Sequence, residues 1–288
     1  MRFLALLLLG NPYAVCQAQE ELKPKITLRY FDSRGRAEPI RLTLAALGLP
    51  FDEVTYGNCN GGGNCPEGVD EDWGTEKKKG VQSGRLPFGQ LPSMTYVDMV
   101  TGVTYDMVQS QAILRFLGKH HKFYGTCEQE EILIDVAMGG VGDMRAKYSQ
   151  LVYNEQMADK QKRQQLLEEY KGNYLPQWLG YYEDLLLRAG GEYFGGSSFS
   201  IADTMVFDML DHNLRVDPHC LDKLPALDAF HIAIGHKPGL WVYLQEEQIG
   251  PRRKWANGEK AFYDTPSRKP AGTGYIGPPK ETKPKQDL

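Results

Sequence analysis

The sequence predicts an α/β domain followed by an all-α domain, and three observations support this. Residues 24–121 show strand and helix patterns in the order strand, helix, strand, irregular segment, hairpin, helix, which is typical of a thioredoxin-like α/β domain. Residues 126–250 show almost wholly helical periodicity. A length of 288 residues suits two domains with tails better than one domain of average size.

The elements of the first domain follow from local patterns. Alternating β-branched and aromatic residues predict a strand at 26–31, and Ile40, Leu44 and Leu47 repeat at helical spacing after it. Pro39 suits the first turn of that helix, where a missing N–H is tolerated. Further on we expect a strand at 51–56, a hairpin at 93–98 and 103–106, and a helix at 109–120.

Residues 57–84 form an insertion within this pattern. The segment is rich in Gly and Asn, then acidic, then basic, and Trp73 is its single large apolar residue. So long a loop in a compact domain is either functional or partly mobile, and it has room for a helix. Cys59 and Cys65 bracket a flexible loop, so they could form a disulfide in a secreted protein or remain free thiols.

The sequence pattern of the second domain predicts a series of helices. Ser200 can cap one of them, Asp203 occupies the third helical position as in a capping box, and Phe199 supplies an apolar staple. The expected helices cover 128–150, 156–170, 176–189, a stretch starting at Ser200, 224–235 and 239–248.

Both ends of the chain differ from the domains. Residues 1–18 resemble a secretory signal, with Arg2 before a short apolar run and small residues after it. We expect cleavage and a secretory or extracellular location, the alternative being an uncleaved tail on a cytoplasmic protein. Residues 251–288 hold nine Lys/Arg, four Asp/Glu, six Pro and four Gly, which predicts a basic, disordered or loosely docked tail.

Sequence composition and spacing bear on three further classes of function: membrane-spanning, nucleic-acid-binding and metal-binding. No apolar run reaches the length of a membrane span. The formal net charge of −4 gives no indication of a nucleic-acid partner, and none is expected. No Cys/His cluster has the spacing of a zinc site, so no metal is expected.

The stretch YFDSRGRAEPIR, residues 30–41, lies where the first strand meets the first helix. The phenol of Tyr30 would end the strand and face the N-terminus of the helix, with Arg34 and Arg36 close by. Helix N-termini and arginines attract anions. The stretch therefore predicts an anion site, the alternative being a half-packed tyrosine beside solvated arginines.

Four motifs in chain order resemble those of a known family. They are Tyr-Phe-x-x-Arg-Gly-Arg-Ala-Glu from Tyr30, Leu-Pro-Phe-Gly-Gln-Leu-Pro at 86–92, Gln109-Ser110, and Ser-Ile-Ala-Asp from Ser200. Over about residues 24–248 the chain resembles a cytosolic-type glutathione S-transferase, and it is most similar to the tyrosine-using sigma class. The resemblance implies the glutathione transferase fold, a homodimer and a role in detoxification.

The resemblance also implies a glutathione site. Leu91–Pro92 resembles the family's cis-proline turn, whose backbone can pair with an extended peptide. Gln109 and Ser110 would hold the γ-glutamyl carboxylate at a helix N-terminus, although Ser110 could be only a cap. Trp73 and Lys77 would hold the glycine end, with Lys78 or Lys79 as alternatives to Lys77. The full implied set is Tyr30, Arg36, Trp73, Lys77, Gln90, Leu91, Gln109, Ser110 and Asp143 of the partner subunit.

The resemblance also implies a catalytic role for Tyr30. A free thiol has a pKa of about 8.5, so little of it is thiolate at neutral pH. A phenol that donates a hydrogen bond to the sulfur favours the thiolate, and lowering the thiol pKa by roughly two units corresponds to about 2.7 kcal/mol. Ser33 is the competing candidate, because some transferase classes use a serine in this turn.

The implied function is conjugation of glutathione, the co-substrate, to hydrophobic electrophiles, and it permits isomerase or peroxidase side activities. The electrophile pocket would use Phe31, Met144 and Tyr148, near Arg145. The first alternative is a non-catalytic ligand-binding or structural protein of the same fold. The second, a disulfide oxidoreductase, is disfavoured because the turn holds no cysteine.

Overall fold

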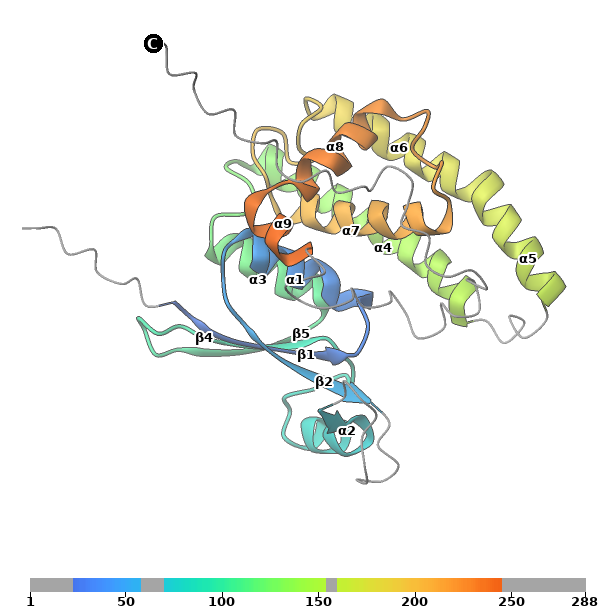
Figure 1. The fold of residues 1–288 in the computed structure, drawn as a ribbon. Coiled ribbons are helices and arrows are strands. Elements are labelled where there is room, and N and C mark those ends of the chain that lie inside the picture. Colours follow the sequence, from blue (N-terminus) through green and yellow to red (C-terminus); the bar gives the residue numbers. More distant parts are fainter. Residues whose placement is uncertain (1–22, 58–69, 154–159, 245–288) are drawn as a thin grey trace, which may run out of the picture.

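A computed structural model describes residues 23–57, 70–153 and 160–244, with a sheet in the first part and helices packed over it (Figure 1). The sheet has five strands in the order β3-β2-β1-β4-β5. The elements of this part are β1 Lys25–Phe31, the 3-10 turn η1 Gly35–Ala37, α1 Glu38–Ala46, β2 Asp52–Gly57, β3 Glu71–Asp72, α2 Trp73–Gln82, β4 Ser93–Val97, β5 Thr104–Val108 and α3 Ser110–His120.

β1 lies at the centre of the sheet and ends next to the catalytic candidate. It pairs in parallel with β2 and antiparallel with β4. Its side chains alternate in burial, and Ile26, Leu28 and Tyr30 share the buried face. The period of two therefore brings the Tyr30 side chain to the core face at the carboxyl end of the strand.

The helical part begins with α4 and is built around α7. Its elements are α4 Glu128–Tyr153, α5 Lys160–Glu169, the π-helical turn η3 Tyr170–Tyr174, α6 Leu175–Arg188, α7 Ile201–Val216, α8 Pro225–Gly235 and α9 Pro238–Leu244. All residues of α7 from 201 to 214 are buried, and α7 packs against α1, α4 and α8. In Figure 1, α1 and α3 lie between the sheet and this helical part, and α2 lies on the far side. The architecture confirms a thioredoxin-like α/β domain followed by an all-α domain.

The start of α7 forms the expected capping box. The N–H and hydroxyl of Ser200 both donate to Asp203 Oδ2, at 2.7 and 2.9 Å, and the N–H of Ala202 donates to Ser200 Oγ at 3.3 Å. The N–H of Phe194 donates to the other carboxyl oxygen of Asp203 at 2.8 Å. Burial raises the pKa of Asp203 to about 7, against the effect of these donors.

The described end of the 57–84 insertion is helical. Asp72 caps α2 by accepting the N–H of Thr75 at 2.8 Å. Gly80 lets Leu86 pack against this helix, because a Cβ atom at Gly80 would lie 2.5 Å from the Leu86 side chain. Apolar periodicity could not define α2, since charged and polar residues dominate its sequence.

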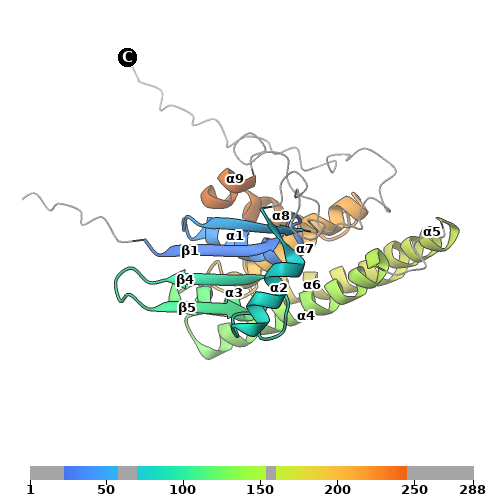
Figure 2. The same ribbon diagram turned by 90° about the horizontal axis from the view of Figure 1, so that it is seen from below.

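Two expected helices, 156–170 and 176–189, are joined by η3 rather than separated. Tyr170 opens η3 and donates from its hydroxyl to Asn213 Oδ1 of α7 at 2.8 Å. A buried polar group needs such a partner, so the π-helical turn places Tyr170 where α7 can satisfy it. Figure 2 shows α5 and the end of α4 running away from the sheet.

Several expectations lie outside the described residues. These are the signal at 1–18, the pairing of Cys59 with Cys65, the last turn expected at 245–248 and the tail at 251–288. Within 23–57, 70–153 and 160–244, no helix combines the length and the apolar character that a membrane crossing requires.

Candidate active site

The turn after β1 holds the phenol of Tyr30 in place. The hydroxyl oxygen accepts a hydrogen bond from the backbone N–H of Arg36 at 3.0 Å. The ring is buried, and its centroid lies 5.5 Å from that of Phe31. A phenol that accepts one hydrogen bond still has its own proton to donate. The Tyr30 hydroxyl therefore still has a proton to donate, and it lies at the N-terminal end of η1 and α1.

Ser33, the competing candidate, is buried in the same turn. Its N–H donates to the carbonyl oxygen of Phe31 at 2.6 Å, and its carbonyl oxygen accepts from Arg41 Nη1 at 3.1 Å. The backbone of Ser33 thus holds the turn together. A catalytic role for its hydroxyl stays a prediction.

The two arginines of the turn have different surroundings. Arg36 is exposed, whereas Arg34 is fully buried, with Asp211 Oδ2 3.0 Å from Nη1 and Asp208 Oδ1 3.2 Å from Nη2. Asp208 also accepts from Arg145 Nη2 at 2.5 Å. The expectation that both arginines serve an anion is therefore wrong for Arg34, because the carboxylates of α7 neutralise it inside the protein.

Strand register brings the sequence-predicted segments to one end of the sheet. Arg29 of β1 pairs with Ser93 of β4, and Ser93 pairs with Val108 of β5. The residues just beyond this row are Tyr30 and Gln109, and Leu91–Pro92 precedes Ser93. Three of the four motifs thus meet at the same end of the strands, although they are far apart in sequence.

The Leu91–Pro92 bond is cis, as expected. Gln90 is exposed and Leu91 is buried. Lys77 of α2 lies over the same segment, because a Cβ atom at Gly89 would lie 3.1 Å from Lys77 Cε. The structure thus brings Lys77 beside the turn that leads into the cis bond.

Trp73, the first residue of α2, packs on the end of β1. Its ring meets Phe31 edge-on at a centroid distance of 5.4 Å and lies 6.0 Å from the ring of Tyr56. Phe31 in turn contacts Tyr30. Trp73 therefore lies one aromatic ring away from the phenol, which is compatible with the expected site.

Gln109 has a strained backbone next to Ser110. Its φ is 72° and its ψ is 108°, and it occupies the N-cap of α3 without a side-chain capping bond. A non-glycine residue with positive φ is uncommon and occurs often at ligand-binding sites. Ser110 is the first residue of α3 and is buried, so it is not the N-cap itself.

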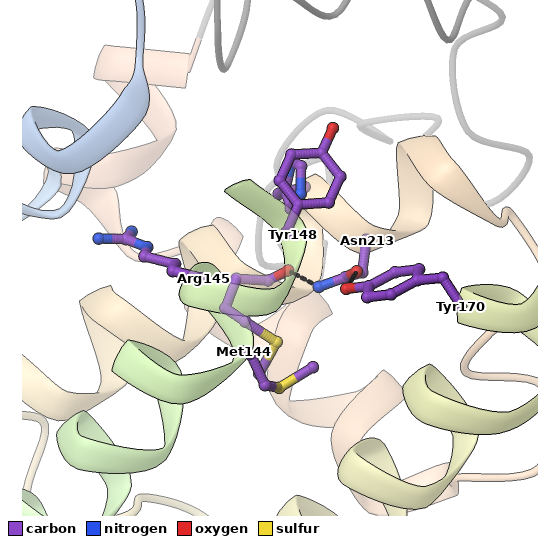
Figure 3. A pocket seen from close by; sticks show the side chains of 7 residues that line it. Met144, Arg145, Tyr148, Tyr170 and Asn213 are labelled. Carbon is purple, nitrogen blue, oxygen red and sulfur yellow. Dashed lines mark hydrogen bonds between the residues drawn. The ribbon is translucent and has the colours of Figure 1, made fainter. Parts of the chain in front are cut away.

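Met144 and Tyr148 lie in the helical part rather than beside Phe31. Both are 1% exposed and line a small internal cavity of about 10 Å³, about the space of one water molecule. Figure 3 shows this cavity with Arg145, Tyr170 and Asn213 around it. Phe31 packs with Tyr30 and Trp73 instead. The structure does not bring the three residues together, and the electrophile pocket stays a prediction.

A buried histidine closes the same cavity. The ring of His212 lies 3.9 Å from that of Tyr148, centroid to centroid, in an edge-on arrangement. Burial, with the nearby guanidinium groups of Arg34 and Arg145, holds the pKa of His212 well below its ordinary value. His212 is therefore neutral and serves as a packing group there.

Asp143 is exposed on α4. It shares a face of that helix with Val136, seven residues earlier, and with Ile132, because residues at these spacings align along a helix. The carboxylate is thus available to a second molecule.

Sequence comparison decides the family. Over 242 residues the chain is 31% identical to glutathione S-transferase P 1 of Bufo bufo, which covers 82% of this chain and 100% of that protein. The chain belongs to the glutathione S-transferase family. The family model described as glutathione S-transferase, C-terminal domain, matches residues 142–247. A glutathione S-transferase of Dirofilaria immitis is 32% identical over 235 residues, 81% of this chain and 98% of that one.

Solved structures of glutathione S-transferases have the same fold. The Pi-class enzyme of Onchocerca volvulus has a TM-score of 0.64 and 31% identity, with 81% of this chain and 98% of that chain covered. The sigma-class enzyme of Fasciola hepatica has a TM-score of 0.63 and 26% identity, with coverages of 77% and 95%. These similarities confirm the glutathione transferase fold. They include both classes, so the closer likeness to the sigma class stays a prediction.

Sequence reasoning on this transferase missed the residues that support the turn. Arg41 is buried in α1 and donates to the carbonyl oxygens of Ser33 and Arg34, at 3.1 and 3.3 Å. A charged residue inside an apolar helical run is a signal that could have identified it. Tyr243 of α9 also reaches this cluster, and no local pattern marks it. In the described part of the chain, no group of three or more His, Cys, Asp or Glu residues could hold a metal ion; the expectation of a metal-free enzyme stays a prediction.

Proposed function

We propose that the chain conjugates the glutathione thiolate to hydrophobic electrophiles, with the Tyr30 hydroxyl stabilising the thiolate. The observation that carries this proposal is the hydrogen bond from the Arg36 N–H to Tyr30 Oη at 3.0 Å. It fixes the oxygen and leaves the phenolic proton for the sulfur. The nucleophile is then the glutathione sulfur and not a protein atom.

The energetic effect follows from the thiol pKa. A thiol of pKa about 8.5 is only a few per cent ionised at pH 7. Lowering the pKa by about two units makes most of the bound glutathione thiolate, and it requires about 2.7 kcal/mol of preferential stabilisation. A hydrogen bond to a charged acceptor, together with a helix N-terminus, can supply that amount.

The rest of glutathione would lie along the same end of the sheet, where β1 ends and β4 begins. In this proposal the backbone of Leu91 pairs with the cysteinyl part, and Gln90 lies beside it. At the N-terminus of α3, the backbone N–H groups and the Ser110 hydroxyl, with Gln109 beside them, donate hydrogen bonds to the γ-glutamyl carboxylate. Lys77 and Trp73 take the glycine carboxylate, and Arg36 adds positive charge near the sulfur. Phe31, which packs beside Tyr30, remains the proposed contact for the electrophile, whereas Met144 and Tyr148 line a separate buried cavity and are not proposed as part of that pocket.

We also propose a homodimer. Phe88, Ile132 and Val136 are 65%, 62% and 55% exposed, although all three are large and apolar. Ile132 and Val136 lie one turn apart on the face of α4 that carries Asp143. Exposed apolar stripes of this kind support association. In a dimer, Asp143 of the partner subunit would reach the glutathione amine.

The test is a paired binding and turnover assay on the purified protein. The full chain should bind immobilised glutathione and conjugate it to a chromogenic aryl halide. Binding without turnover would favour the non-catalytic ligand-binding alternative, and no binding would overturn the glutathione site altogether. Isomerase and peroxidase side activities can be assayed on the same preparation.

The secretory location is a separate proposal, supported by the signal-like residues 1–18. The mass of the mature protein from a eukaryotic secretory host would test it. A mass lower by the N-terminal segment supports cleavage, and the full mass with intracellular retention contradicts it.

A further inference from the structure

A cluster of buried charged side chains around Arg41 holds the turn at residues 33–36. This turn carries the Arg36 N–H that donates to the Tyr30 hydroxyl. Arg41 Nη1 donates to the carbonyl oxygens of Ser33 and Arg34 and to Glu38 Oε2, the last at 3.1 Å. Arg41 Nε donates to Glu53 Oε1 at 2.8 Å. Burial alone would lower the pKa of Arg41, but the carboxylates of Glu38 and Glu53 raise it above its ordinary value. The guanidinium is therefore always charged.

This guanidinium is close to the Tyr30 phenol in two ways. The carbonyls it binds, on Arg34 and Ser33, lie two and three residues before the Arg36 N–H that bonds Tyr30 Oη. Its central carbon also lies 5.9 Å from the centroid of the Tyr30 ring. A shift of Arg41 would therefore change both the geometry of the turn and the electrostatic potential at the phenol.

The last described helix, α9, reaches the same cluster from the far end of the chain. Tyr243 Oη donates to Glu38 Oε2 at 3.2 Å, which is the carboxyl oxygen that Arg41 also binds. α9 lies in backbone contact with α1, since a Cβ atom at Gly239 would be 2.1 Å from the carbonyl oxygen of Ala45 (Figure 1). The position of the Tyr243 hydroxyl is thus set by a helix that packs closely against α1.

We propose that Tyr243 is a positioning residue for Tyr30. It acts through Glu38, Arg41 and the Ser33–Arg34 carbonyls, and it helps set how strongly the Tyr30 hydroxyl stabilises a bound thiolate. The inference rests on the proposed function of Tyr30. The physical reason is that the Tyr243 hydroxyl shares a buried carboxylate with Arg41, and such networks couple their members beyond simple pairs. Without the Tyr243 hydroxyl, the side chains of Glu38 and Arg41 would shift. The backbone turn at Ser33 and Arg34, which Arg41 holds, would shift with them.

The test compares Tyr243→Phe with the parent protein and with Val242→Ala. Tyr243→Phe removes one hydroxyl and keeps the ring, and Val242 is the neighbouring α9 residue, 51% exposed. For each protein saturated with glutathione, the thiolate absorbance is measured over a pH series, and its midpoint gives the pKa of the bound thiol. We expect Tyr243→Phe to raise that pKa by about half a unit, which is about a threefold loss of kcat/KM below the pKa.

Further readouts separate this role from a merely structural one. The loss in Tyr243→Phe should disappear at a pH above the thiol pKa, the KM for glutathione should hardly change, and Val242→Ala should keep the parent pKa. In a Glu38→Gln background, Tyr243→Phe should add little, because the two residues act through one contact. Urea unfolding of every variant controls for lost stability.

Each contrary result is informative. An unchanged thiol pKa in Tyr243→Phe overturns the positioning role, even where stability falls, and so does an equal pKa shift in Val242→Ala. In both cases the function proposed for Tyr30 survives if the parent still forms the thiolate. A parent that binds no glutathione, or forms no thiolate on binding it, overturns both proposals.

Discussion

A Cβ atom added at Gly35 would lie 2.5 Å from the hydroxyl oxygen of Tyr30 and 2.9 Å from the Cε1 atom of its ring. Gly35 also has a φ of +40°, which side chains rarely adopt. The backbone of the turn therefore lies directly against the phenol, and only glycine permits this contact. The Arg36 N–H reaches Tyr30 because of that close approach.

Gly35→Ala should therefore displace the phenol. We expect a loss of turnover of about 100-fold, because a small misplacement of a reacting group has effects of that size, and a loss of stability of about 2 kcal/mol. Conjugation kinetics and urea unfolding measure the two effects. Gly84→Ala is the matched control, since its φ is +77° but no atom lies within 4 Å of the new Cβ. Parent-like turnover in Gly35→Ala would contradict the close contact.

Gly239→Ala should separate α9 from α1. The new methyl group would lie 2.1 Å from the carbonyl oxygen of Ala45, so we expect a loss of about 2 kcal/mol in unfolding free energy from overpacking. Gly180→Ala in α6 meets no atom within 4 Å and should instead stabilise the protein by about 0.5 to 1 kcal/mol through helix propensity. Chemical denaturation of both variants checks the signs, and equal effects would show that the helices are not in backbone contact.

Glu130 should contribute stability that depends on pH. Its carboxylate accepts from the hydroxyl groups of Ser197 and Thr126, both at 2.6 Å, and from the N–H of Thr126 at 2.7 Å. These bonds, with Ser197 as the largest cause, lower the pKa of Glu130 to about 2 from 4.5. A lowered folded-state pKa means that the unfolded chain binds more protons between these values, so stability is lost as pH falls through them.

The measurement is urea unfolding of the parent and of Glu130→Gln over a pH series. The stability difference between the two should be full above a pH of about 4.5 and should shrink as the pH approaches about 2. A difference that stays constant across this range would show that the carboxylate charge does not matter for the Ser197 and Thr126 contacts.

Phe88→Ser should weaken the proposed dimer. Phe88 is exposed at 65% of its surface and lies outside the buried core, so its loss should lower self-association with little change in monomer stability. Sedimentation over a concentration series measures the shift. Val100→Ser in the turn between β4 and β5, where Val100 is 78% exposed, is the control and should sediment like the parent. A monomeric parent would contradict the dimer itself.

The fold could be predicted because its signals are local. The apolar alternation of β1, Pro39 in the first turn of α1 and the Ser200–Asp203 capping box each depend on a few neighbouring residues, and the structure forms all three. Helix α2 was poorly defined by the sequence because it depends on an Asp72 cap and a glycine contact rather than on an apolar face.

The surroundings of the site depend on long-range contacts, and these were not predictable. Arg34 looked like an anion ligand because it lies in a turn beside Arg36, yet Asp208 and Asp211, more than 170 residues away, bury and neutralise it. Tyr243 reaches Glu38 across 205 residues. Nothing in either local sequence indicates the partner. Met144 and Tyr148 have the right helical spacing for a pocket, but spacing does not distinguish a site from the core.

The most direct test of the role of Tyr30 is the pKa of the glutathione thiol bound to Tyr30→Phe. The bound thiol should titrate close to its free value of about 8.5 instead of about two units lower as in the parent, so turnover should fall about 25-fold at pH 7 and about 100-fold well below the parent's thiol pKa. Glutathione affinity should stay nearly intact, because the remaining contacts are untouched. If Tyr30→Phe keeps the low thiol pKa and Ser33→Ala loses it, Ser33 activates the thiol and the role of Tyr30 is refuted.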